Sequence, residues 1–130
     1  MSLGGFVAKS KFRPGDVVWA LVPDRNGISK SDPRPLLVIH PGPQTEEQRL
    51  VCLCVSTRSW DDPKDPAVEM PWDAETGSTS GLFEWCRVVL LWRVLVGQPS
   101  VIRKSGRVTN AFLARIIEER DRASAMTQQR

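Results

Sequence analysis

Residues 34–41, RPLLVIHP, form an apolar run of strand length that begins at a proline-flanked arginine and ends at Pro41. Residues 49–57, RLVCLCVST, form a second run, which turns polar only at its last two positions. Upstream, a turn at 13–16 leads into VVWALV, residues 17–22, whose β-branched and aromatic side chains favour a strand. A strand that is apolar on both faces has to be covered on both, by the core on one side and by another element or a second subunit on the other.

The pattern continues with short strands and ends in a helix. Residues 67–70 alternate and predict an edge strand, residues 86–96 are the most apolar stretch, and Ser105-Gly106 predicts a turn. The sequence then takes a helical period, with apolar residues at 112, 113, 116 and 117, Thr109 as N-cap and fraying after Arg122. The predicted fold class is mainly β, a small barrel or strongly bent sheet with a C-terminal α-helix packed on it.

The chain has 130 residues, 41% apolar and 25% charged, as expected for one ordinary folded domain. Residues 1–13 are predicted to be a flexible leader, 14–122 the folded domain and 123–130 a loose tail. The apolar run at 86–96 is too short to span a bilayer, and the N-terminus lacks a signal-peptide pattern, so a cytoplasmic location and no membrane partner are expected.

Three cysteines, two of them at Cys52 and Cys54, lack the spacing of a disulfide frame or a metal site. They are expected to be reduced, buried thiols, and the sequence predicts neither a metal nor a cofactor. The net charge of +3 permits a polyanionic partner without requiring one.

Arg34 is the first candidate for chemistry. Pro33 and Pro35 restrict its backbone, and the planar donor fork of a guanidinium matches two phosphate oxygens at once. Ser56 and Thr57 end the next predicted strand, so their hydroxyls come near Arg34 if the two strands are neighbours. The structural alternatives are an arginine paired with Asp32 at a strand end, and hydroxyls that only terminate a strand.

Other candidates are weaker. His40 is the only histidine, but it lies at the opposite end of its strand from Arg34, roughly 20 Å away by strand rise. Trp19 and Trp92 lie in apolar runs and are expected in the core, whereas Trp60, Trp72 and Trp85 are candidates for stacking on bases, with Trp60 the best. Nucleic-acid contacts are expected from a set of loop residues: Arg25, Lys30, Arg58, Ser59 and Trp60.

Taken in order, these motifs resemble the PemK/MazF family of toxin endoribonucleases. Residues 15–19, GDVVW, are similar to the family's opening strand, and 34–39, RPLLVI, to its RP strand. Residues 51–57 resemble the strand that ends at a reactive Thr or Ser, Gly81-Leu82 the opening of a later strand, and 106–117 the turn into the last helix. The likeness covers residues 14–120.

The resemblance implies an SH3-like barrel that forms a homodimer and cuts single-stranded RNA without a metal, leaving 2′,3′-cyclic phosphate and 5′-hydroxyl ends. It implies that Arg34 and Thr57, or Ser56 in its place, are catalytic, and that a cognate antitoxin blocks the RNA groove. No proline precedes Ser56-Thr57 here, unlike the family pattern, so the choice of hydroxyl stays open. The alternative is a non-cleaving module of the same fold, either a degenerate toxin or a CcdB-type gyrase inhibitor.

Overall fold

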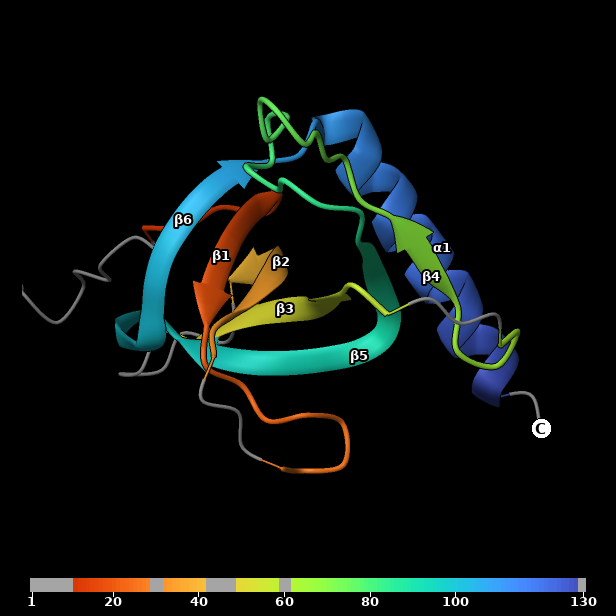
Figure 1. The fold of residues 1–130 in the computed structure, drawn as a ribbon. Coiled ribbons are helices and arrows are strands. Elements are labelled where there is room, and N and C mark those ends of the chain that lie inside the picture. Colours follow the sequence, from red (N-terminus) through yellow and green to blue (C-terminus); the bar gives the residue numbers. More distant parts are fainter. Residues whose placement is uncertain (1–10, 29–31, 42–48, 59–61, 129–130) are drawn as a thin grey trace, which may run out of the picture.

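The computed structural model describes residues 11–28, 32–41, 49–58 and 62–128 (Figure 1). Within these ranges the chain forms strands and one long helix, joined between β5 and β6 by a single 3-10 turn at Gln98–Ser100. The elements are β1 (Asp16–Ala20), β2 (Arg34–Pro41), β3 (Arg49–Ser56), β4 (Ala67–Glu69), β5 (Arg87–Gly97), β6 (Val101–Arg107) and α1 (Asn110–Gln128).

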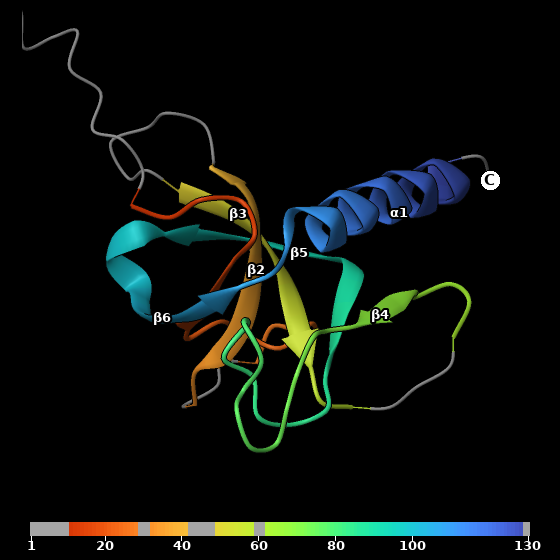
Figure 2. The ribbon, with the colours of Figure 1, turned by 90° about the horizontal axis from the view of Figure 1, so that it is seen from above.

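The strands described form one antiparallel sheet of six in the order β4-β5-β3-β2-β1-β6. The sheet is strongly curved, and β5 bends as it passes along β3, where the pairing slips between Leu53 and Val55 (Figures 1 and 2). β4 lies at one edge, as its alternating sequence predicts. The prediction of a mainly β fold with one C-terminal helix is confirmed.

Both faces of the central strands are buried, in two hydrophobic clusters. Val17 belongs to the first cluster, together with the inward residues of β2 and β3 and Ile116 of α1. Val18 and Ala20 belong to the second cluster, with Cys52 and Cys54 on the same face. The prediction that the first strand is covered on both sides is thus confirmed, and both covers come from this chain.

α1 begins where the sequence predicts and ends later. The Phe112 backbone N–H donates to the Thr109 hydroxyl at 3.1 Å, which is an N-cap hydrogen bond. The helix continues to Gln128, so the loose tail predicted at 123–130 is wrong for its described part, while residues 129–130 lie outside the described residues. Ion pairs at i, i+4 spacing, Arg115–Glu119 and Glu118–Arg122, support the exposed turns. No described helix is long and apolar enough to cross a membrane.

β6 was not predicted, and the expected turn at Ser105-Gly106 is wrong because both residues lie inside this strand. The glycine serves a close backbone approach instead. A Cβ on Gly106 would lie 2.1 Å from the Thr79 carbonyl oxygen, and one on Gly81 would lie 2.2 Å from that of Ser105. Gly81-Leu82, expected to open a strand, therefore lies in the loop that packs on β6, ahead of β5.

Asp16 links the start of β1 to the end of β6 through ion pairs with Lys104 and Arg107. Its side chain is 1% exposed, and Oδ1 lies 3.2 Å from both Arg107 Nη1 and Lys104 Nζ. The Arg13 backbone N–H donates to Oδ2 at 2.8 Å. Gly15 precedes it with φ +98°, a conformation that favours glycine.

Of the predicted leader 1–13, residues 1–10 lie outside the described residues.

Candidate functional site

A groove of about 980 Å³ opens where β2 begins and β3 ends. Its walls come from the loops that precede β2, follow β3 and precede β5, and from side chains of β1, β5 and β6. This groove brings Arg34, Ser56 and Thr57 together, as expected if β2 and β3 are neighbours. The side chains that line the groove include Trp19, Asp24, Arg25, Asp32, Arg34, Ser56, Thr57, Arg58, Asp65, Phe83, Glu84, Cys86, Trp92 and Arg103.

The Arg34 guanidinium is held in place from two directions. Its Nη2 donates to Asp24 Oδ1 at 2.9 Å, and its central carbon lies 4.5 Å from the centre of the Trp92 ring. The side chain is 19% exposed, and Nε is buried without a hydrogen-bond partner among the described residues. The pairing with Asp32 considered from sequence is replaced by Asp24, while Asp32 lies on the groove wall.

Arg25 approaches the same tryptophan. Its guanidinium carbon is 5.6 Å from the centre of the Trp92 ring, and it forms an ion pair with Asp65. Both arginines that face Trp92 are therefore paired with a carboxylate, which fixes their positions. The predicted RNA contacts Arg25 and Arg58 line the groove, whereas Lys30, Ser59 and Trp60 lie outside the described residues.

Trp19 and Trp92, which were expected in the core, pack on the core and also line the groove. Trp92 packs against the second hydrophobic cluster and Trp19 against the first, but both are only partly buried and both line the groove. Arg34 and Arg25 lie over the Trp92 ring, and the Arg103 guanidinium carbon lies 4.3 Å from the centre of the Trp19 ring. Apolar runs on either side of each tryptophan gave no signal of this second role.

The two candidate hydroxyls have different surroundings. Ser56 is buried, and its Oγ accepts a hydrogen bond from the Arg58 backbone N–H at 3.2 Å, a turn typical of serine at a strand end. Thr57 is exposed, lines the groove and makes no hydrogen bond within the described chain. The geometry thus separates a structural hydroxyl at Ser56 from an accessible one at Thr57.

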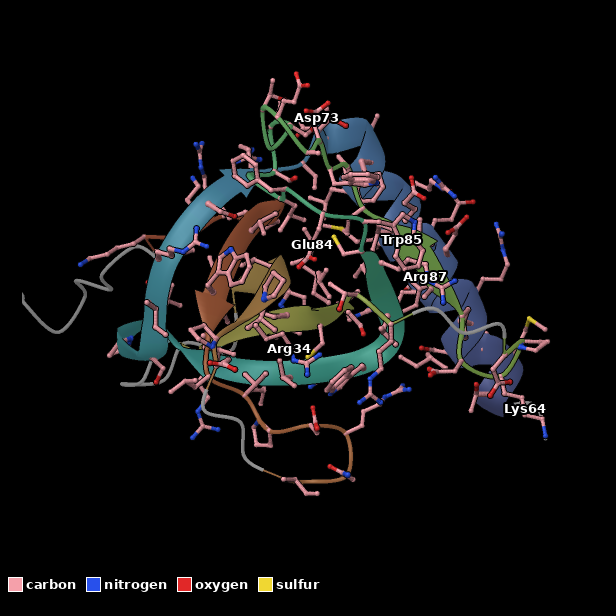
Figure 3. All side chains as sticks on the ribbon, in the orientation of Figure 1. Arg34, Lys64, Asp73, Glu84, Trp85 and Arg87 are labelled. Carbon is pink, nitrogen blue, oxygen red and sulfur yellow. The ribbon has the colours of Figure 1, made fainter. Side chains whose placement is uncertain are left out.

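The groove carries no formal net charge from its described residues, because four arginines and four carboxylates line it. Two of the carboxylates are used by Arg34 and Arg25, while Asp32 and Glu84 form no ion pair with a described residue. Glu84 and Arg34 both line the groove, and Figure 3 labels them in the middle of the view, to the left of Trp85 and Arg87. Phosphate binding here would depend on placed guanidinium groups more than on a positive field.

The thiols near the groove are poor nucleophiles. Burial raises the pKa of Cys54 to about 12, although Arg34 and Arg25 act to lower it. Burial is the main cause that raises the pKa of Cys86 to about 11, and the nearby carboxylates of Glu84 and Glu69 raise it further. Burial is also the main cause that raises the pKa of Cys52 to about 12, with a smaller contribution from Cys54. Because the thiolate is the reactive form, none of the three attacks a substrate near neutral pH. All are buried and free, as predicted.

The remaining candidates lie elsewhere. His40 is exposed near the far end of β2 and does not line the groove. Trp85 Nε1 donates a hydrogen bond to Glu69 Oε1 at 2.7 Å, and the Arg87 guanidinium carbon lies 5.4 Å from the centre of the Trp85 ring. Neither Trp85 nor Trp72 lines the groove. No group of three His, Cys, Asp or Glu side chains in the described ranges is arranged to hold a metal ion.

No protein-family model matches this chain, and a search of curated proteins finds no match. The antiparallel sheet with its single C-terminal helix, and the groove that holds Arg34 and Thr57, are therefore the basis for a functional assignment.

Proposed function

We propose that this chain is a toxin endoribonuclease of PemK/MazF type that cuts single-stranded RNA in the groove. The observation that carries the proposal is the meeting of Arg34 and Thr57 in one groove, from the start of β2 and the end of β3. A curved six-stranded sheet with a C-terminal helix is compatible with the SH3-like barrel that the sequence resemblance implies. The proposal includes a homodimer and a cognate antitoxin that covers the groove.

In the proposed reaction the RNA 2′-oxygen loses its proton and attacks the adjacent phosphorus. The bond from phosphorus to the 5′-oxygen breaks, and the 5′-oxygen takes up a proton from solvent water, which gives a 2′,3′-cyclic phosphate and a 5′-hydroxyl. Arg34 stabilises the extra negative charge on the phosphoryl oxygens, and the Thr57 hydroxyl orients one of them. Arg34 is not the base, because a guanidinium has N–H donors and no acceptor for a proton. Asp32 and Glu84, the groove carboxylates outside the described ion pairs, are the groups able to accept the 2′-hydroxyl proton.

Incubation of the purified protein with a long, weakly structured RNA in EDTA tests the activity. We expect discrete fragments whose 3′ ends carry cyclic phosphate and whose 5′ ends can be phosphorylated by a kinase without prior phosphatase treatment. A mock purification from cells without the gene controls for contaminating nucleases. RNA that stays intact over a range of sequences would rule out the proposed nuclease.

Thr57→Val and Ser56→Ala separate the two hydroxyls. Thr57→Val keeps the side-chain shape and removes the hydroxyl, so kcat should fall roughly 100-fold, the cost of losing one donor to a charged transition state. Ser56→Ala should lower kcat less than about tenfold and lower the free energy of unfolding by roughly 1 kcal/mol, because it breaks the hydrogen bond to Arg58. Initial rates and thermal unfolding measure both. The reverse order of kcat losses would make Ser56 the reactive hydroxyl.

A non-cleaving module is the second candidate, and the absence of formal net charge in the described groove favours it. Such a module, a degenerate toxin or a CcdB-type gyrase inhibitor, binds a nucleic acid or a protein without cutting. Retarded migration of intact RNA in the same assay would support a degenerate toxin that binds without cutting. Neither fragments nor retardation, with inhibition of DNA supercoiling, would support a gyrase inhibitor.

A further inference from the structure

A second arginine–tryptophan pair lies on the groove, on different strands from Arg34 and Trp92. β6 places Arg103 directly opposite Trp19 of β1 in the sheet register, and the guanidinium carbon lies 4.3 Å from the centre of the ring. Trp19 packs with one part of its surface against the first hydrophobic cluster. The ring is therefore a fixed support for Arg103, an exposed residue that lines the groove.

Arg103 differs from the other stacked arginines of the groove in what its N–H groups bind. Arg34 donates to Asp24 and Arg25 pairs with Asp65, whereas the Arg103 guanidinium forms no hydrogen bond or ion pair with any described residue. A guanidinium stacked on an aromatic face keeps the N–H donors at its edge available. Its orientation is fixed by the ring while its donors are unused, which is the arrangement that favours binding of a phosphate from solution.

An exposed aromatic ring accompanies this arginine. Phe83 also lines the groove and is 59% exposed. The loop that carries it rests on β6, since Gly81 packs against the Ser105 carbonyl and the Ser105 hydroxyl donates to the Ser80 carbonyl at 2.8 Å. An exposed ring is a poor core residue but a good support for a nucleobase, because every base has a flat face to stack.

The groove is large enough for more than the reacting phosphate. Its volume of about 980 Å³ is at the upper end of pockets that enclose a drug-sized ligand, roughly 300–1,000 Å³. A single phosphate at Arg34 and Thr57 uses only part of this space.

We propose that Arg103, held on Trp19, and Phe83 form a second nucleotide-binding subsite, which takes the nucleotide next to the cleaved bond of a single-stranded RNA. Arg103 binds its phosphate and Phe83 stacks on its base. This subsite rests on the proposed function, and its task is to bind and position the RNA, whereas Arg34 and Thr57 act on the reacting phosphate.

Binding of a fluorescently labelled, single-stranded RNA of about a dozen nucleotides tests the subsite. Its 2′-hydroxyls are methylated, so that no 2′-oxygen can attack the adjacent phosphorus. We expect Arg103→Ala to raise Kd about tenfold and to lower the slope of log Kd against log salt by about 0.7, the contribution of one phosphate contact to a single strand. Phe83→Ala should raise Kd about tenfold without changing that slope, because stacking releases no counterion. With cleavable RNA, both variants should raise KM and leave kcat within about threefold.

Arg93→Ala is the matched control, because Arg93 is an exposed arginine of β5 that does not line the groove. It should leave Kd and the salt slope unchanged. If wild-type protein cleaves RNA and Arg103→Ala binds RNA as tightly as wild type, the subsite is wrong and the proposed function stands. If folded wild-type protein neither binds nor cleaves RNA, both proposals are wrong.

Discussion

Arg34→Ala should lower the rate of RNA cleavage by about a thousandfold while the protein stays folded. The Arg34 guanidinium lines the groove together with Thr57 and is held by Asp24 and Trp92. Losing a placed charge at a phosphoryl transition state costs roughly 10²- to 10³-fold in rate. Arg34→Lys should recover only part of the rate, because an ammonium keeps the charge but not the planar fork. Single-turnover cleavage of a defined RNA measures both variants.

Folding of the variant is expected because Arg34 is not needed by the core. Its partner Asp24 has a side chain that is 22% exposed, so water can solvate the carboxylate when the arginine is gone. Thermal unfolding should shift by only a few degrees. Arg93→Ala again serves as the control and should cleave like wild type. An Arg34→Ala protein that cuts RNA within tenfold of the wild-type rate would remove Arg34 from the mechanism.

Among the substitutions proposed, Asp16→Ala should cause the largest loss of stability. We expect the free energy of unfolding to fall by roughly 3 kcal/mol. The carboxylate is almost fully buried and accepts from the Arg13 backbone, Arg107 and Lys104. Hydrogen bonds to a charged group contribute about 1.5–3 kcal/mol each. The ion pairs with Arg107 and Lys104 contribute less than this, because both cations are partly exposed to water. Urea unfolding measures the change, and the melting temperature should fall by roughly 10 °C.

Asp121→Ala is the comparison for Asp16. Asp121 also pairs with an arginine, Arg120, but its side chain is 63% exposed. Its loss should change the free energy of unfolding by no more than about 0.5 kcal/mol, as for most exposed ion pairs. A similar loss for the two variants would mean that burial of Asp16 is not what makes its contacts important.

The strands that sequence predicts best are those with continuous apolar runs and clear ends. The run at 34–41 coincides with β2, because proline bounds it on both sides. β6 was missed because VIRKSGR has neither an apolar run nor a clean alternation, and its glycine suggested a turn. The end of α1 was placed too early because the apolar period stops after Ile117 and residues 121–127 include no buried side chain.

The sequence predicts the positions of those site residues that lie at the ends of strands. It does not predict the contacts that depend on the conformation of a loop. Arg34 and Thr57 meet because β2 and β3 are neighbours, which two adjacent apolar runs already suggest. The pairing of Arg34 with Asp24 depends on the fold of a loop without periodicity. Arg103 could not be expected beside Trp19 without knowing that β6 exists and pairs with β1.

The pairing of β1 with β6 also determines when during synthesis the groove can be completed. Asp16 and Arg107 are 91 residues apart in sequence, so all of β2 to β6 must be made before they meet. Closing so long a loop is slow compared with forming the neighbouring hairpins, since its entropy has to be offset by contacts that form late. A ribosome-bound chain that lacks β6 has Arg34 and Thr57 but neither Arg103 nor the Asp16 ion pairs. Its groove would be completed only after β6 has left the exit tunnel.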